Sequence, residues 1–248
     1  MLKYQLMRLI SVLLLAIAAF AAESTTSSVD KRLKTASQAF EDVMHIPDKS
    51  IPRDLLNKAR CVVIIPDLKK GAFVFGGKYG RGFVSCRQAG NFGAPGAIRI
   101  EGGSFGLQLG GESTDVILLV MNQKGMERLL SDKFTLGGEA AIALGPIGRE
   151  TSANTDVRMT AEILSWSRSR GVFGGLSLEG ATLRPDSSEN EKLYGKPIGN
   201  REILTGPVPV PARARSFVAM VNRFGGTPAA KAAPANKSKS SKSKPKPR

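Results

Sequence analysis

Apolar residues recur every three or four positions near both ends of the predicted folded region. In the first stretch they are Val29, Leu33, Ala36, Phe40, Val43 and Met44. In the second, within residues 211–224, they are Phe217, Val218, Met220, Val221 and Phe224. This spacing gathers the apolar side chains on one side of an α-helix. The sequence therefore predicts an amphipathic helix at each end, with one side to bury and one side to expose.

Between these helices, short strands alternate with glycine-rich corners. Strand-like segments run over residues 61–65, 72–75, 79–86, 97–101, 103–109 and 114–121, and again over 134–144, 158–167 and 171–179. Shorter helices are predicted over 52–59, 122–130 and 186–194. Many short strands with glycine corners favour a curled sheet or barrel. We predict one α+β domain over residues 23–226, with a curled antiparallel β-sheet or barrel-like core flanked by N-terminal and C-terminal helices.

The first 22 residues follow the pattern of a secretory signal peptide. Lys3 and Arg8 precede an apolar run, and Ala19-Phe20-Ala21 provides a small-residue cleavage site. A membrane anchor is the alternative, but a bilayer is crossed by about 20 apolar residues and this run is shorter. We therefore predict an exported protein, periplasmic or extracellular and peripheral to the membrane.

The last segment, residues 227–248, is composed mainly of Ala, Pro, Ser and Lys and has no acidic residue. Such a composition buries too little apolar surface to order a chain, so we predict a disordered basic tail. Its cations are Lys231, Lys237, Lys239, Lys242, Lys244, Lys246 and Arg248, out of a net charge of +15 for the whole chain. A basic tail attracts anionic phospholipid or an acidic envelope polymer, although it can also serve as a solubilising spacer. Export makes nucleic acid an unlikely partner.

The chain has two cysteines, Cys61 and Cys86. An oxidising compartment permits a disulfide between them. If Cys61 opens one strand and Cys86 closes another two strands later, a simple meander places them at opposite ends of the sheet. The sequence therefore leaves open whether they form a bridge or two separately buried thiols.

Residues typical of catalysis, of a cofactor site or of a metal site are sparse. His45, the one histidine, is expected to cap the end of the first helix. Ser165 has no neighbouring base to activate it. The segment 71–79 superficially resembles a phosphate loop, which needs a lysine directly after its second glycine and then Ser or Thr. Here Gly77 separates Gly76 from Lys78, and Tyr79 follows the lysine, so the spacing fails. We therefore predict no catalytic residues, no cofactor and no metal. The alternative, a hydrolase, would need scattered carboxylates or Ser165 to converge in the fold.

Cations collect on the first helix and on glycine-rich turns. The candidate lipid-binding residues are Lys31, Arg32, Lys34, Lys69, Lys70, Lys78 and Arg81. A helix with cations on one side and apolar residues on the other can lie in a lipid headgroup layer. The alternative is that the apolar side packs on the sheet as ordinary core.

Several separate blocks of sequence resemble the SYLF domain, also called the Ysc-type actin-binding family. They include GGSFGLQLGGESTDVILLVMNQKGMERLL from Gly102, FTLGGEAAIALGPIGR from Phe134, SWSRSRGVFGGLSLEGATL from Ser165 and KLYG from Lys192. Trp166 stands where the pattern leads us to expect tyrosine. The resemblance covers about residues 29–224.

This resemblance implies a lipid-binding module without a catalytic residue set. Eukaryotic members are associated with phosphoinositides, the phosphorylated forms of phosphatidylinositol. The contact is attributed to a basic N-terminal helix, and the matching positions here are Lys31, Arg32 and Lys34. Fungal members are associated with actin, a role that belongs to a cytoplasmic setting and is therefore unlikely for an exported chain.

Together these features predict a non-enzymatic lipid-binding protein of the cell envelope. It would dock on anionic phospholipid through the basic amphipathic helix, with the apolar side of that helix inserting. The alternative is a scaffold whose basic tail binds an acidic cell-wall polymer or a protein partner.

Overall fold

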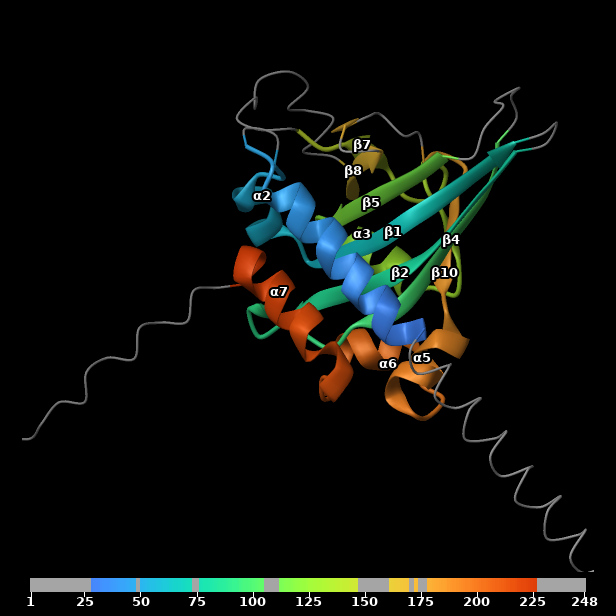
Figure 1. Ribbon diagram of the computed structural model, residues 1–248. Coiled ribbons are helices and arrows are strands. Elements are labelled where there is room, and N and C mark those ends of the chain that lie inside the picture. The colour runs from blue at the N-terminus through green and yellow to red at the C-terminus, as the bar shows by residue number, and fades with distance from the viewer. Residues whose placement is uncertain are drawn as a thin grey trace, which may run out of the picture.

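A ten-stranded curled sheet forms the centre of the protein, and helices cover its outer face (Figure 1). The computed structural model describes residues 28–47, 50–72, 76–104, 112–146, 161–169, 172–173 and 178–226. The predicted signal peptide and basic tail lie outside these residues. Among the described residues, no helix is long and apolar enough to cross a membrane.

Eight strands follow one another across the sheet in the order β6-β10-β4-β2-β1-β5-β8-β7, while β3 pairs with β2 and β9 with β8. β7 joins β8 in parallel, and the other named strand pairs are antiparallel. The strands are β1 (Cys61–Ala72), β2 (Gly76–Gln88), β3 (Asn91–Phe92), β4 (Gly96–Ser104), β5 (Glu112–Val120), β6 (Phe134–Thr135), β7 (Ile142–Leu144), β8 (Ile163–Ser169), β9 (Val172–Phe173) and β10 (Thr182–Pro185).

The longest described helix, residues 28–44, lies across β1, β2 and β5 beside α7, on the same face of the sheet (Figure 1). Phe40 of this helix meets Phe224 of α7 edge to face, with ring centroids 5.8 Å apart. The remaining helices are α2 (Arg53–Lys58), α3 (Gln123–Leu129), α5 (Ser187–Tyr194), α6 (Asn200–Thr205) and α7 (Arg215–Gly225), which follows a 3₁₀ turn at Ala212–Ala214.

Alternation along the central strands divides the interior into two cores. Val62 and Ile64 of β1 face the helices, whereas Val63 and Ile65 face the concave side of the sheet. Helix 28–44 and α7 complete the first core. α3, α6, β6 and β10 close the second core, so the sheet curls around a filled interior. The predicted α+β class and barrel-like curled sheet are confirmed, with the parallel β7–β8 pair as an addition.

β1 is longer than the sequence predicts because it continues through a bulge. A strand end was expected at Pro66-Asp67, but the pairing with β2 and β5 resumes beyond them after a shift in register. Asp67 adopts a φ of 51°, and its backbone N–H donates to Asp115 at 3.1 Å. Opposite the bulge, a side chain at position 82 would lie 2.0 Å from the Ile64 carbonyl oxygen, so only glycine fits there.

The long β1–β2 hairpin also settles the state of the cysteines. Cys61 and Cys86 are direct partners in the register, with Cα atoms 4.0 Å apart, and they form a disulfide. The expectation of opposite sheet ends is wrong because β1 continues past the bulge to Ala72 and pairs with β2 over most of its length. The two cysteines therefore lie at the open end of one hairpin.

Elsewhere the differences lie in short or irregular segments. α6 and β10 were not predicted, since each has only a few residues. The predicted strand 134–144 is divided into β6 and β7, because 137–139 form a turn that begins at Gly137, with a φ of 79°. The predicted strand 103–109 is described only at its start, where it belongs to β4.

Removing the disulfide is expected to destabilise the fold without changing it. Because the bridge closes a loop with a sequence separation of 25, the variant Cys61→Ala with Cys86→Ala should lose about 3 kcal/mol of unfolding free energy, through a larger chain entropy of the unfolded state. Guanidinium unfolding measures this loss. A reductant should lower the stability of the wild type by a similar amount and leave the variant unchanged; equal stability of oxidised and reduced wild type would contradict the expectation.

Candidate functional site

A pocket of about 380 Å³ opens where the first turns of helix 28–44 meet β1 and β2. Four of the seven predicted lipid-binding residues line it: Lys31 and Arg32 from the helix, Lys69 from β1 and Arg81 from β2. The other lining residues are Ser28, Thr35, Pro66, Asp67, Tyr79 and Gly80. The fold thus brings cations from three segments to one opening.

The helix contributes to this pocket through the side that does not face the core. Ser28, Lys31, Arg32 and Thr35 follow the three and four spacing of one helical side. The opposite side is buried, with Leu33 3% exposed and Phe40 0% exposed. The packing of that apolar side on the sheet therefore turns the cations outward toward the pocket.

Strand register brings the remaining lining residues together. Lys69 of β1 is the direct partner of Tyr79 on β2, and direct partners in an antiparallel pair share a face of the sheet. Arg81 lies two residues beyond Tyr79 and therefore on the same face. Phe83, the next residue on this face, is already part of the core under the helices.

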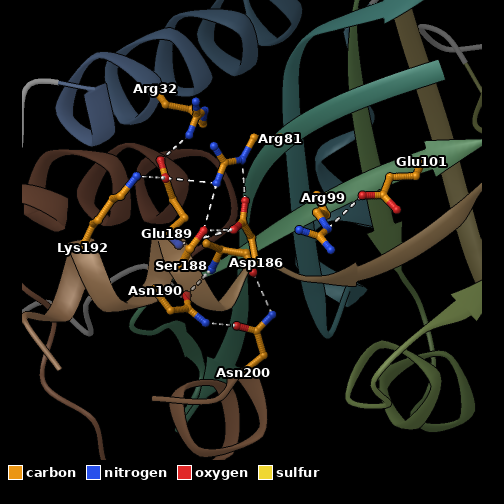
Figure 2. A network of polar contacts seen from close by, with 11 residues as sticks. Arg32, Arg81, Arg99, Glu101, Asp186, Ser188, Glu189, Asn190, Lys192 and Asn200 are labelled. Carbon is orange, nitrogen blue, oxygen red and sulfur yellow. Dashed lines mark hydrogen bonds and ion pairs between the residues drawn. The ribbon is translucent and has the colours of Figure 1, made fainter. Parts of the chain in front are cut away.

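Arg32 and Arg81 are held in place by two buried carboxylates (Figure 2). Arg81 Nε lies 2.5 Å from Asp186 Oδ2, and Arg81 Nη2 lies 3.3 Å from Glu189 Oε2. Arg32 forms a second ion pair with Glu189. The side chains of Asp186 and Glu189 are each 1% exposed. This network therefore joins helix 28–44, β2 and α5, and it neutralises much of the charge of both arginines.

α5 is positioned for this role by its N-cap and by buried amides. Asp186 Oδ1 accepts from the Glu189 backbone N–H at 3.3 Å, which caps the helix. Asn190 accepts from the Ala97 N–H at 2.7 Å and donates to Asn200 Oδ1 at 2.7 Å. These bonds attach α5 and α6 to β4, so the two carboxylates are held against the sheet (Figure 2).

Opposing effects set the pKa values in this network. Burial alone would raise the pKa of Asp186, but the hydrogen bond and charge of Arg81, with bonds from Ser188 and the Glu189 N–H, hold that pKa below its ordinary value. The same hydrogen bond raises the pKa of Arg81, against the effect of burial. Both groups therefore stay charged near neutral pH.

The other three predicted residues lie apart from the pocket. Lys34 is exposed on helix 28–44 but does not line it. Lys70 and Lys78 are direct partners across β1 and β2, and each is the neighbour in sequence of Lys69 or Tyr79. Because successive side chains of a strand alternate between faces, Lys70 and Lys78 project to the opposite face of the sheet. Burial lowers the pKa of Lys78, and the charge of Lys70 lowers it further. The seven cations do not form one surface.

The expectation that the apolar side of the first helix inserts into lipid is wrong for this conformation. Its apolar residues belong to the first core, between the helices and the sheet. Met44, the most exposed of them, is 9% exposed. Withdrawing them would expose the sheet face that they cover. Packing against β1, β2 and β5 thus competes directly with insertion.

Residues considered for catalysis take structural positions. The Nδ1 atom of His45 contacts the Glu41 carbonyl oxygen at 2.8 Å, as a C-terminal cap does. Ser165 is buried and donates to the Ala143 carbonyl oxygen at 3.2 Å. In the part of the chain that the structure describes, no three His, Cys, Asp or Glu side chains gather in a way that could hold a metal ion.

Tyr79, Asp67, Asp186 and Glu189 are site residues that the sequence did not reveal. Tyr79 was considered only as a mismatch in a phosphate loop, and Asp186 only as the start of a helix. The register that sets Tyr79 beside Lys69 depends on the bulge at Asp67. Long-range pairing of Arg81 with Asp186, 105 residues later, leaves no local signal in the sequence.

The curled sheet, the covering helices and an open cationic pocket define the class of this protein as an α+β domain with a surface pocket. A model of the family described as "Ysc84: Las17-binding protein actin regulator" matches residues 101–224. Among similar proteins, the SH3 domain-containing YSC84-like protein 1 of Homo sapiens is 32% identical over 205 residues, which cover 80% of this chain and 60% of that protein. Protein YSC84 of Saccharomyces cerevisiae is 34% identical over 172 residues, covering 67% of this chain and 36% of that protein.

This chain belongs to the Ysc84 family, whose domain is also called SYLF. An SH3 domain-containing protein of Schizosaccharomyces pombe is similar as well, 33% identical over 201 residues that cover 79% of this chain and 44% of that protein. The chain thus spans about 60% or less of the length of these relatives. The family's description names a binding protein and a regulator.

Neutralising Asp186 is expected to flatten the acid dependence of stability. Since its pKa is lower in the folded protein, it stabilises the fold fully above its unfolded pKa, near about 4, and this contribution is lost as pH falls through the folded pKa. Asp186→Asn keeps the helix cap but removes the charge facing Arg81, so it should cost about 3 kcal/mol at neutral pH. Its deficit relative to wild type should shrink between about pH 5 and pH 2.

Chemical denaturation at a series of pH values measures both curves. Comparing the two proteins cancels the contributions of other acids, including Asp115, whose pKa is raised by burial. A deficit that is constant with pH would show that the ion pair with Arg81 does not set the acid dependence.

Proposed function

We propose that the protein binds the anionic lipid surface of a membrane, with the pocket between helix 28–44 and the β1–β2 hairpin as its contact. The observation that carries this proposal is the convergence of Lys31, Arg32, Lys69 and Arg81 on one opening. Asp67 is the one acidic residue among the described lining residues, and its Oδ1 accepts a hydrogen bond from Ser113 at 2.9 Å. A binding role needs no catalytic group in this opening.

Exposed lysines supply most of the attraction. Lys31 and Lys69 are exposed at the opening, and Lys34 is exposed nearby on the same helix. Each cation near an anionic membrane contributes about 1 kcal/mol, and the contribution falls off within about 8–10 Å at physiological salt. Asp186 and Glu189 offset the charge of Arg32 and Arg81, so these arginines act mainly as fixed hydrogen-bond donors for a phosphate oxygen.

The domain docks as a folded unit, with helix 28–44 still packed on the sheet. Binding of this kind costs little conformational entropy, because the network of Asp186 and Glu189 already fixes two of the cations. It depends on charge rather than on insertion of the helix, and therefore weakens as salt increases.

In this proposal the protein is exported and acts in the periplasm or outside the cell, peripheral to the membrane. The buried disulfide between Cys61 and Cys86 supports it, because disulfides persist mainly in oxidising compartments. The signal-peptide pattern of residues 1–22 points the same way.

A protein partner is the second candidate function. The matched family is described as a "Las17-binding protein actin regulator", and this description speaks against the sequence-based prediction that actin is an unlikely partner. Cosedimentation with actin filaments tests this candidate separately. The role of the basic tail as a ligand for acidic envelope polymer stays a prediction.

Reversing the charge of the pocket lysines is expected to abolish most membrane binding. The variant Lys31→Glu with Lys69→Glu should bind vesicles of mixed phosphatidylglycerol and phosphatidylcholine at least tenfold more weakly than wild type at about 0.15 M salt, since two cations become anions at the surface. Cosedimentation measures the bound fraction. Vesicles of phosphatidylcholine alone should bind neither protein.

Lys58→Glu with Lys133→Glu provides the matched control. Both lysines are exposed and outside the pocket, and the change in net charge is the same. This control should keep most of the wild-type binding. Equal losses in the two variants would contradict the pocket as the contact and leave only a nonspecific effect of net charge.

A further inference from the structure

A membrane-binding protein that acts through charge alone is held only at the surface of the headgroup layer. The first helix cannot supply an apolar contact, because its apolar side lies in the core. Among the described residues, two large apolar side chains are substantially exposed: Tyr79, at 48%, and Leu144, at 55%. These two are therefore the natural candidates for a side chain that enters the lipid.

Tyr79 lies at the cationic pocket. It is one of the lining residues, as are Lys31 and Lys69. The register of β1 and β2 makes Lys69 its direct neighbour, and Arg81 follows on the same face of the sheet. Its ring is exposed although the next two residues on this face, Arg81 and Phe83, are progressively more buried. The ring thus projects beyond the area that helix 28–44 covers.

We propose that Tyr79 is the side chain that enters the headgroup layer of an anionic membrane, flanked by Lys31 and Lys69. This inference rests on the proposed function and names the contact that anchors it. Tyrosine suits the headgroup level because its ring is apolar while its hydroxyl stays hydrated. Lysine stems cover apolar surface and keep the ammonium group among the phosphates. No part of the fold has to open, since the ring is exposed before binding.

Leu144 offers a matched comparison on another part of the sheet. It lies on β7, the strand at the end of the sheet order, three strands away from β1. Its strand pairs with β8, and it does not line the cationic pocket. In the proposed orientation, Tyr79 reaches the lipid and Leu144 does not.

Tryptophan placed at these two positions reports which one enters the lipid. The chain has a single tryptophan, Trp166, which is 2% exposed and donates to the Pro146 carbonyl oxygen at 3.0 Å. The full chain carrying Tyr79→Trp or Leu144→Trp is mixed with phosphatidylglycerol and phosphatidylcholine vesicles whose acyl chains carry bromine on the carbons nearest the headgroups, where it quenches tryptophan emission by contact. The emission of Tyr79→Trp should shift to the blue and be quenched, whereas Leu144→Trp should change no more than the wild type.

Affinity gives a second readout of the same contact. Tyr79→Ala is expected to bind these vesicles about tenfold more weakly, which corresponds to about 50–60 Å² of ring surface at about 25 cal/mol per Å². Its unfolding midpoint should stay close to that of wild type, because the side chain is half exposed. Wild-type affinity of Tyr79→Ala would overturn the inference.

The outcomes separate this inference from the proposed function. Salt-sensitive cosedimentation of Tyr79→Trp without quenching, or equal quenching at both positions, would overturn the role of Tyr79 and leave the cationic pocket as the contact. A wild-type protein that binds no anionic vesicles would instead contradict the proposed function itself.

Discussion

Burial of the apolar side of helix 28–44 against the sheet determines what the rest of the molecule can do. Val29, Ala36 and Phe40 are fully buried there, and burying each large apolar side chain is worth about 1.5–3 kcal/mol. This packing fixes the rotation of the helix about its axis. As a result, Lys31 and Arg32 face the part of the β1–β2 hairpin beside the bulge at Asp67, and the pocket forms between the helix and these strands. The same packing withholds the apolar side from any other surface.

Charge is distributed within the site according to burial. The two arginines lie deeper, and two buried carboxylates, Asp186 and Glu189, hold them in place. An ion pair of this kind needs all of its partners, because a single unpaired charge left in the interior is costly. The exposed lysines need no buried carboxylate as a partner, because water solvates them, and they can leave that water to contact an anionic surface. In the proposed function the two arginines therefore serve both the fold and binding, whereas the exposed lysines serve binding alone.

Local patterns in the sequence were enough to predict the fold class, the first helix, α2, α3, α5 and α7. Their apolar spacing and caps lie within single segments, as with Asn122, which caps α3 by accepting from the Gly125 N–H at 2.9 Å. The disulfide could not be settled in this way, because it depends on β1 passing through the bulge at Asp67 and pairing with β2 to its end. α6 was missed because its six residues are too few to show a helical period and its N-cap, Gly199, has no side chain to mark the start, whereas Pro52 marks the start of the equally short α2.

The candidate site was predicted only in part, because the sequence shows which residues are cations but not which of them the fold brings together. A cluster of cations is visible in sequence, and four of the seven chosen residues do line one pocket. Alternation of side chains across a strand separates Lys69 from Lys70, which neighbour each other in sequence but face opposite sides of the sheet. The partners of Arg32 and Arg81 lie more than 100 residues away on α5. Only the assembled fold distinguishes arginines that support the structure from lysines that remain exposed.

Hydrogen–deuterium exchange with and without anionic vesicles tests most directly whether the folded domain docks through the pocket. The account predicts slower exchange of backbone amides in residues 28–35, 67–70 and 76–81 when vesicles are present, with residues 36–44 of the helix as protected as they are in the free protein. Faster exchange in residues 36–44 on binding would mean that the helix leaves the sheet and inserts, and unchanged exchange at the pocket would mean that membranes are met elsewhere; either result would contradict the account.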